Sequence, residues 1–315
     1  MGVSILCSFR RTWNRFWFSE AEPLPAALFR ISFGFLLLSF FVSLLPHFTE
    51  YYSAQGILSL DLLDPHRLHQ DRHSVFYWTD GWIPTQGLGC VGILAAACFT
   101  LGWKTRWAAV ALFVLQTSMI NTSRNLINGE DLLFRSLLFF SCFAPLDQRL
   151  SLRNWIERRS NHRDSQEQAA PQIWPLRLIQ LNLLLIYLIS LPSKLISDSA
   201  WLNGDALYWV MSNEIWCRWP WPSHFYGWLG KVATYSTVLT EGLFPFAVWI
   251  PGLRIASLVA IAVLHLGMAI FMQNMGFFAL GMVCALWVFV PQSLLTKLGD
   301  RRATLSKPTA NIESS

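Results

Sequence analysis

Residues 253–294 read LRIASLVAIAVLHLGMAIFMQNMGFFALGMVCALWVFVPQSL, and Arg254 is the only Asp, Glu, Lys or Arg among them. A helix needs roughly 20 apolar residues, at about 1.5 Å of rise per residue, to cross about 30 Å of hydrocarbon. The stretch is long enough for two such helices, with the polar pair Gln273–Asn274 between them. It predicts a protein that spans a membrane.

The rest of the chain repeats this pattern. Together the apolar stretches predict an all-α fold, a polytopic bundle of about eight transmembrane helices. The predicted spans are 24–46, 86–103, 106–121, 131–146, 174–194, 231–250, 253–273 and 275–294.

We expect one membrane domain, residues 24–295, to make up nearly the whole fold. Residues 1–23 form a short segment before it, and residues 296–315 form a tail. Residues 147–173 are polar, with RRSNHRDSQEQAAPQ at their centre, and predict a mobile linker between two spans.

Composition excludes several other classes of protein. Hydrophobic residues make up 53% of the chain and charged residues 14%, whereas a soluble domain carries about 25% charge. With 16 Trp and 23 Phe the chain is also too apolar to be disordered. The net charge of +5 does not predict nucleic-acid binding, because the charges cluster in short loops beside apolar stretches. The six Cys contain no CxxC pair, so neither a disulfide framework nor a metal site is indicated.

The distribution of Lys and Arg predicts the orientation of the bundle. If the N-terminus is cytoplasmic, the predicted inner segments hold 15 of these residues and the outer loops hold 4. Cytoplasmic loops carry an excess of Lys and Arg, so both termini are predicted to be cytoplasmic. The basic residues of the outer loops are Arg67, Arg72, Arg124 and Arg218.

Two outer loops are long and aromatic. Residues 47–85 are rich in His, Tyr and Trp, and residues 195–230 contain WCRWPWPSHFYGW. Trp and Tyr concentrate at membrane–water interfaces, which predicts an interfacial position for the second loop. The alternative is that it forms a lid over a substrate site.

Ionisable residues inside the predicted spans each need a partner or a water-filled cavity. For Arg30 and Arg135 we expect a structural role: each either forms an ion pair between helices or extends its side chain to the headgroups. Glu241 lies in the middle of the span 231–250, and its expected partner is Arg30 or Arg135. The alternative for Glu241 is a proton relay.

Lys194 and His265 are the residues most suggestive of chemistry. Lys194 closely follows Pro192 at the end of its span. Desolvation can turn a lysine into a base at neutral pH, although an interfacial lysine is the simpler interpretation. His265 is predicted to lie in the outer half of the membrane, on the same side as Lys194, Asn121 and Arg124. Their convergence suggests a cavity that opens outward.

Several motifs, in order, resemble one family. They are FRISFGFLLL with YYSAQGILSL, TLGWKTR, NTSRNLINGEDLL, YLISLPSKLISDSAWLNGDAL, TEGLFPF and LHLGMAIFMQNMGFFALGM. Together they resemble the horizontally transferred transmembrane (HTTM) domain, the membrane region shared by vitamin K-dependent gamma-carboxylase and many bacterial proteins. The resemblance covers about residues 24–295. It implies a multi-pass protein of the bacterial cytoplasmic membrane.

The resemblance also implies roles for residues. Lys194 occupies the position of the carboxylase's catalytic base, which deprotonates vitamin K hydroquinone. His265 matches a family histidine and Glu241 an acidic position. Arg124 stands where the carboxylase has a histidine, and the large extracytoplasmic domain of the carboxylase has no counterpart. We therefore expect no carboxylation, whereas epoxidation stays open.

Two hypotheses of function follow. In the first, the protein is an enzyme with quinone- or lipid-linked chemistry, in which Lys194, His265 and Glu241 are catalytic. A reduced quinone would be its cofactor, bound by Arg124, Asn121 and Trp201, and membrane lipid its other partner. In the second, it is a non-enzymatic binder, a transporter-like protein or a scaffold, and the same polar residues only satisfy one another.

Overall fold

The computed structural model describes residues 2–53, 56, 73–78, 81–122, 127–160, 172–220 and 227–297. These residues form helices and connecting turns, and the only β-pairing among them is two isolated bridges, Glu20–Gln172 and Cys217–Met272. Four helical stretches in this part of the chain are long and apolar enough to cross a membrane. They are Pro23–Tyr52, Ile83–Leu101, Trp174–Ser197 and Pro251–Phe271. The all-α prediction is confirmed, and the apolar helices are those of a membrane-embedded protein.

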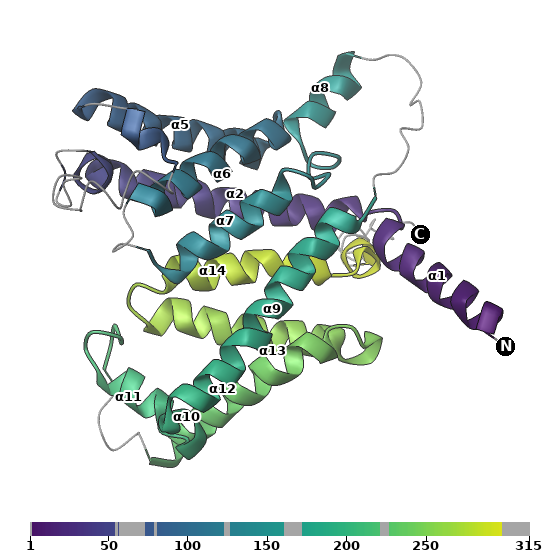
Figure 1. Cartoon of the computed structure of the whole chain (residues 1–315), viewed down its shortest axis with the longest axis vertical. Helices are drawn as coiled ribbons and strands as arrows, with labels where there is room; N and C mark the ends of the chain where they lie inside the picture. Colours follow the sequence, from purple (N-terminus) through teal and green to yellow (C-terminus); the bar gives the residue numbers. More distant parts are fainter. Residues whose placement is uncertain are drawn as a thin grey trace, which may run out of the picture.

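Each apolar segment identified in the sequence lies on a helix (Figure 1). Two predicted boundaries are wrong. The segment 131–146 overruns its helix, which ends at Ser141, and the segment 275–294 contains a helix that ends at Ala285 and continues as a 3-10 turn, Leu286–Phe289. The helices that carry the apolar segments are α2 (Pro23–Leu44), α5 (Trp82–Leu101), α6 (Thr105–Thr122), α7 (Gly129–Ser141), α9 (Trp174–Ser197), α12 (Gly227–Ala247), α13 (Pro251–Phe271) and α14 (Gly276–Ala285).

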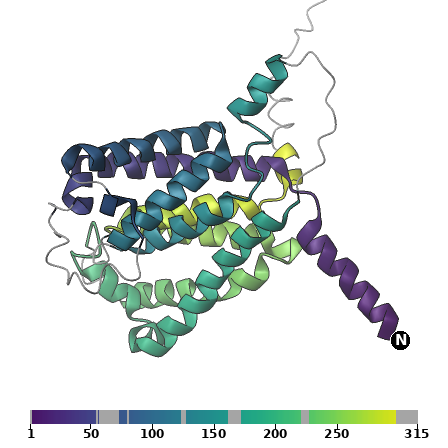
Figure 2. The same ribbon diagram turned by 45° about the horizontal axis from the view of Figure 1, so that its top comes forward.

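The remaining helices lie at the two ends of the bundle. Helices α1 (Gly2–Phe18) and α8 (Leu152–Ser160) extend from one end, as Figures 1 and 2 show. Helices α10 (Ser199–Asn203) and α11 (Ala206–Ser212) lie at the opposite end, where the short helix α3 (Phe48–Tyr52) follows α2.

Helix α14 joins two groups of helices. On one side it packs against α2 and α7, which together with α5 and α6 enclose a core of aromatic rings. The Phe33 ring makes T-shaped contacts with the rings of Phe99 and Phe134 there, with centroids 6.3 and 5.5 Å away. On its other side α14 packs against α13, and α13 leads on to α12 and α9. The candidate site lies in this second group.

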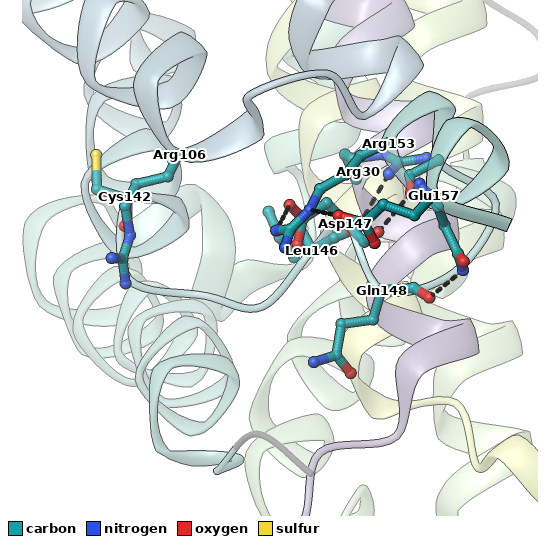
Figure 3. A network of polar contacts seen from close by, with 10 residues as sticks. Arg30, Arg106, Cys142, Leu146, Asp147, Gln148, Arg153 and Glu157 are labelled. Atoms are coloured by element: carbon teal, nitrogen blue, oxygen red, sulfur yellow. Dashed lines mark hydrogen bonds and ion pairs between the residues drawn. The ribbon is translucent and has the colours of Figure 1, made fainter. Parts of the chain in front are cut away.

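Arg30 is completely buried on α2, but it forms no ion pair among the described residues. Its guanidinium donates to the carbonyl oxygens of Leu146, at 3.2 Å, and Leu150 (Figure 3). The interhelical ion pair expected for Arg30 is therefore wrong, because backbone carbonyls of the turn after α7 take the place of a carboxylate. Within the described part of the chain Arg135 also forms no ion pair.

The polar linker 147–173 is partly helical. Arg153 on α8 binds Asp147 at 2.9 Å and Glu157 at 2.8 Å, as Figure 3 shows. Hydrogen bonds from Glu157 and Asp147 raise the pKa of Arg153 above its ordinary value. Residues 161–171 lie outside the described residues, so the predicted mobility of the linker is untested there.

Candidate functional site

Lys194 and Glu241 form an ion pair between α9 and α12. The Lys194 Nζ donates to both carboxylate oxygens of Glu241, at 2.7 and 2.6 Å. The Glu241 side chain is 7% exposed and the Lys194 side chain 27% exposed. The expected pairing of Glu241 with Arg30 or Arg135 is therefore wrong. Lys194 likewise does not simply extend toward headgroups, because its ammonium is held by a buried carboxylate.

A proline interrupts the hydrogen bonding of α9 two residues before Lys194. Pro192 lies inside α9 and cannot donate a hydrogen bond to the carbonyl of Leu188, one turn earlier. Such interruptions at membrane depth are tolerated where protein or a cavity surrounds the freed backbone groups. The last turn of α9, which carries Lys194, borders a cavity of this kind.

The cavity has a volume of about 560 Å³ and lies between α9, α12, α13 and α14. Each helix contributes residues spaced three or four apart, which places them on one face. On α9 they are Tyr187, Ser190 and Lys194, and on α12 Ala233, Thr237 and Glu241. The size is typical of pockets that bind small molecules.

His265 enters the cavity from α13 and is 3% exposed. Its Nδ1 lies 2.9 Å from the carbonyl oxygen of Ile261. Because a carbonyl only accepts, Nδ1 carries the proton and a neutral ring leaves Nε2 as an acceptor. The Tyr187 hydroxyl lies 3.4 Å from Nε2, within reach for a weak hydrogen bond. Tyr187 and His265 thus form a second polar pair on the cavity wall.

Trp201 lines the cavity beside Lys194. The Lys194 Nζ lies 4.7 Å from the centroid of the Trp201 ring, within range of a cation–π contact. Asp198 caps the short helix α10 by accepting from the amide of Ala200 at 2.8 Å. Trp201 on α10 and Met211 on α11 both line the cavity.

The chain after α10 and α11 is hydrogen-bonded to the turn between α13 and α14. The amide of Arg218 donates to the Phe271 carbonyl at 2.8 Å, and the amide of Gln273 donates to the Trp216 carbonyl at 2.9 Å. These hydrogen bonds join the loop that carries Trp201 and Met211 to the turn that carries Met272, and all three residues line the cavity. Residues 221–226 of this loop lie outside the described residues.

The remaining lining is apolar and rich in sulfur. Five of the seven Met in the chain border the cavity, namely Met211, Met268, Met272, Met275 and Met282. Among the described residues no group of three or more His, Cys, Asp or Glu could hold a metal ion. The chemistry available at the site is that of an amine, a carboxylate, an imidazole and a phenol in an apolar surrounding. Such groups bind polar atoms and transfer protons.

The structure brings together four of the six predicted site residues. Lys194, Glu241, His265 and Trp201 all line the one cavity. Asn121 does not line it, and its side-chain amide donates instead to the His73 carbonyl at 2.8 Å. Arg124 lies outside the described residues.

The sequence interpretation missed Tyr187 and Thr237. Tyr187 precedes Lys194 by seven residues and Thr237 precedes Glu241 by four, so each lies on the same helix face as a residue that was identified. A search for polar side chains at helical spacing from Lys194 and Glu241 would have found both.

Comparison with known proteins assigns no family to the chain: no family model matches it, and no curated protein or solved structure matches it significantly.

Proposed function

We propose that the cavity binds a lipid-soluble ring with polar oxygens, such as a reduced quinone, and that Lys194 acts on it as a base. The proposal is carried by the pairing of Lys194 with Glu241 inside an otherwise apolar cavity of about 560 Å³. Ionisable groups inside a membrane protein cost free energy to bury, so where they occur they usually mark a functional site.

The geometry suggests how the residues would act. In the proposed first step the Lys194 ammonium passes a proton to the carboxylate of Glu241, with which it is in hydrogen-bond contact. The resulting amine would take a proton from a hydroxyl bound beside it, and Lys194 would again be an ammonium. Tyr187 lies seven residues before Lys194, about 10 Å along α9 at about 1.5 Å of rise per residue, and its hydroxyl contacts His265 on α13. Tyr187 and His265 offer a second polar contact to the same ligand.

Membership of the HTTM family is part of this proposal. It is supported by the gathering of Lys194, Glu241 and His265 around one cavity, since the resemblance gives a role or a matching position to each. We still expect no carboxylation from this chain. The alternative is a binder without chemistry, in which Lys194 and Glu241 only satisfy one another.

The finer architecture also belongs to this proposal: eight spans with both termini in the cytoplasm. We expect a green fluorescent protein fused after Ser315 to fluoresce and an alkaline phosphatase fused there to be inactive, because that phosphatase matures only outside the cytoplasm. Fusions after Ser212, in the predicted outer loop, should give the opposite pattern. Active phosphatase at Ser315 would overturn the topology.

The ligand prediction is tested by what the protein retains during purification. We expect mass spectrometry to find a co-extracted quinone, and we expect added quinol at about 100 times its Kd to stabilise the protein by about 2.7 kcal/mol in a thermal unfolding assay.

A matched pair of variants on α12 locates the binding. Ala233 lines the cavity, so Ala233→Trp should fill it and abolish retention of the quinone. The neighbouring Val232 is 51% exposed and does not line the cavity, so Val232→Trp should retain it. Absence of any quinone from the wild-type protein, together with no thermal shift, would contradict the proposal.

A further inference from the structure

A second cavity lies at the opposite end of the bundle, beside α8. Its volume is about 830 Å³, and its lining includes Trp103, Lys104, Thr105, Arg106 and Trp107 from the turn into α6. The turn after α7, one side of α8 and the start of α9 complete it. The distribution of Lys and Arg predicts that this end faces the cytoplasm.

Some of the charged side chains that line this cavity have partners of opposite charge, and others do not. Arg153 is bound by Asp147 and Glu157, so these two carboxylates are already occupied (Figure 3). Lys104 and Arg106 have no carboxylate partner among the described residues. Lys104 lies 5.6 Å from the Trp103 ring, and Arg106 uses its Nε to bind the Cys142 carbonyl at 3.0 Å. The terminal guanidinium nitrogens of Arg106 and the Lys104 ammonium are left for an anion.

Thr105 provides an independent indication of a ligand. It lines the cavity and is 3% exposed, yet its Oγ1 has no hydrogen-bond partner within the described structure. A buried hydroxyl without a partner is costly, so such groups are rare in folded proteins. Thr105 is also the first residue of α6, an 18-residue helix whose N-terminus attracts negative charge. An oxygen of a bound anion would satisfy all of these groups together.

We propose that this cavity binds the phosphate of an anionic phospholipid. Lys104, Arg106 and the Thr105 hydroxyl would contact the phosphate. The rim of the cavity carries Trp107, 71% exposed, and Trp103, 46% exposed. Exposed Trp side chains are typical of the level of lipid headgroups, which favours a lipid over a free phosphate ion. Basic pockets on the cytoplasmic side of membrane proteins bind anionic headgroups in this way.

The test is a titration of the detergent-purified protein with short-chain phosphatidylglycerol, phosphatidylcholine or inorganic phosphate, followed by native mass spectrometry. We expect phosphatidylglycerol to bind well, phosphatidylcholine to bind much more weakly, and millimolar phosphate not to displace the bound lipid. Lys104→Gln/Arg106→Gln should weaken phosphatidylglycerol binding about thirtyfold, since each basic residue near an anionic headgroup contributes about fivefold.

Two further variants distinguish binding in this cavity from attraction to general surface charge. Arg159→Gln/Lys297→Gln removes the same charge from exposed positions that do not line the cavity, and it should leave the affinity unchanged. Thr105→Val keeps the shape, and it should weaken binding a few-fold without lowering thermal stability.

Equal losses in both double variants, or equal binding of the two lipids, would overturn the proposal. Displacement of the lipid by inorganic phosphate would show a site for the free ion instead, and would also overturn it. If Lys104→Gln/Arg106→Gln does not fold, the preference of the wild-type protein among the three ligands decides.

Discussion

Lys194→Met is expected to lower the free energy of unfolding by about 3 kcal/mol, because it leaves the buried carboxylate of Glu241 without its partner. The double variant Lys194→Met/Glu241→Met should recover most of this loss, since no uncompensated charge remains in the apolar cavity. Denaturation of the detergent-purified proteins, followed by circular dichroism, measures both changes.

The same variants distinguish an enzyme from a binder. If Lys194 is a base, the double variant regains stability and yet has no quinol-dependent turnover. Lys231→Met is a matched control, because Lys231 is an exposed lysine on α12 that does not line the cavity. It should alter neither stability nor turnover. Full turnover in the folded double variant would exclude the role of base and leave the pair as a structural contact.

Arg30→Met is expected to lower the free energy of unfolding by about 3 kcal/mol or more. The completely buried guanidinium is removed, and the two carbonyl groups that it binds are left without their donor. Met fills much of the space but donates no hydrogen bond. Arg30→Lys should rescue little, since a single ammonium cannot reproduce the planar fork that reaches both Leu146 and Leu150.

Hydrogen exchange of the amides between Leu146 and Leu150 checks the cause as well as the size of the effect. We expect these amides to exchange faster in Arg30→Met than in the wild-type protein. Arg11→Met, at an exposed position on α1, is the control and should change neither exchange nor stability. An Arg30→Met protein as stable as the control would show that the turn after α7 holds its shape without the guanidinium.

The helices could be predicted from the sequence because the membrane leaves the backbone few alternatives. In hydrocarbon every amide and carbonyl must be satisfied within the segment, so an apolar stretch of sufficient length is a helix. The ends were less predictable. Residues 142–146 are apolar and looked like a continuation of α7, yet they form turns, since Pro145 cannot continue the helix and Leu146 supplies a carbonyl to Arg30. That contact joins residues 116 positions apart and leaves no local signal.

Four residues of the candidate site were predictable from the sequence, but the contacts between them were not. Lys194, Glu241 and His265 stood out because the bilayer makes each of them expensive. Which of them meet depends on how α9, α12 and α13 are rotated about their axes, and single-helix patterns do not encode that relation. Glu241 was therefore assigned to arginines on other helices, although Lys194 lies beside it.

The five methionines around the cavity have a consequence for selectivity. A thioether side chain is unbranched, turns about three bonds and is readily polarised, so a wall built from such chains reshapes itself around its occupant. Rigid rings or branched chains would instead fix an outline that only one ligand matches. A lining of this kind should accept rings of several sizes and tails of several lengths. Discrimination then falls to the few fixed polar atoms, and close chemical relatives of one ligand should compete for the cavity with similar affinities.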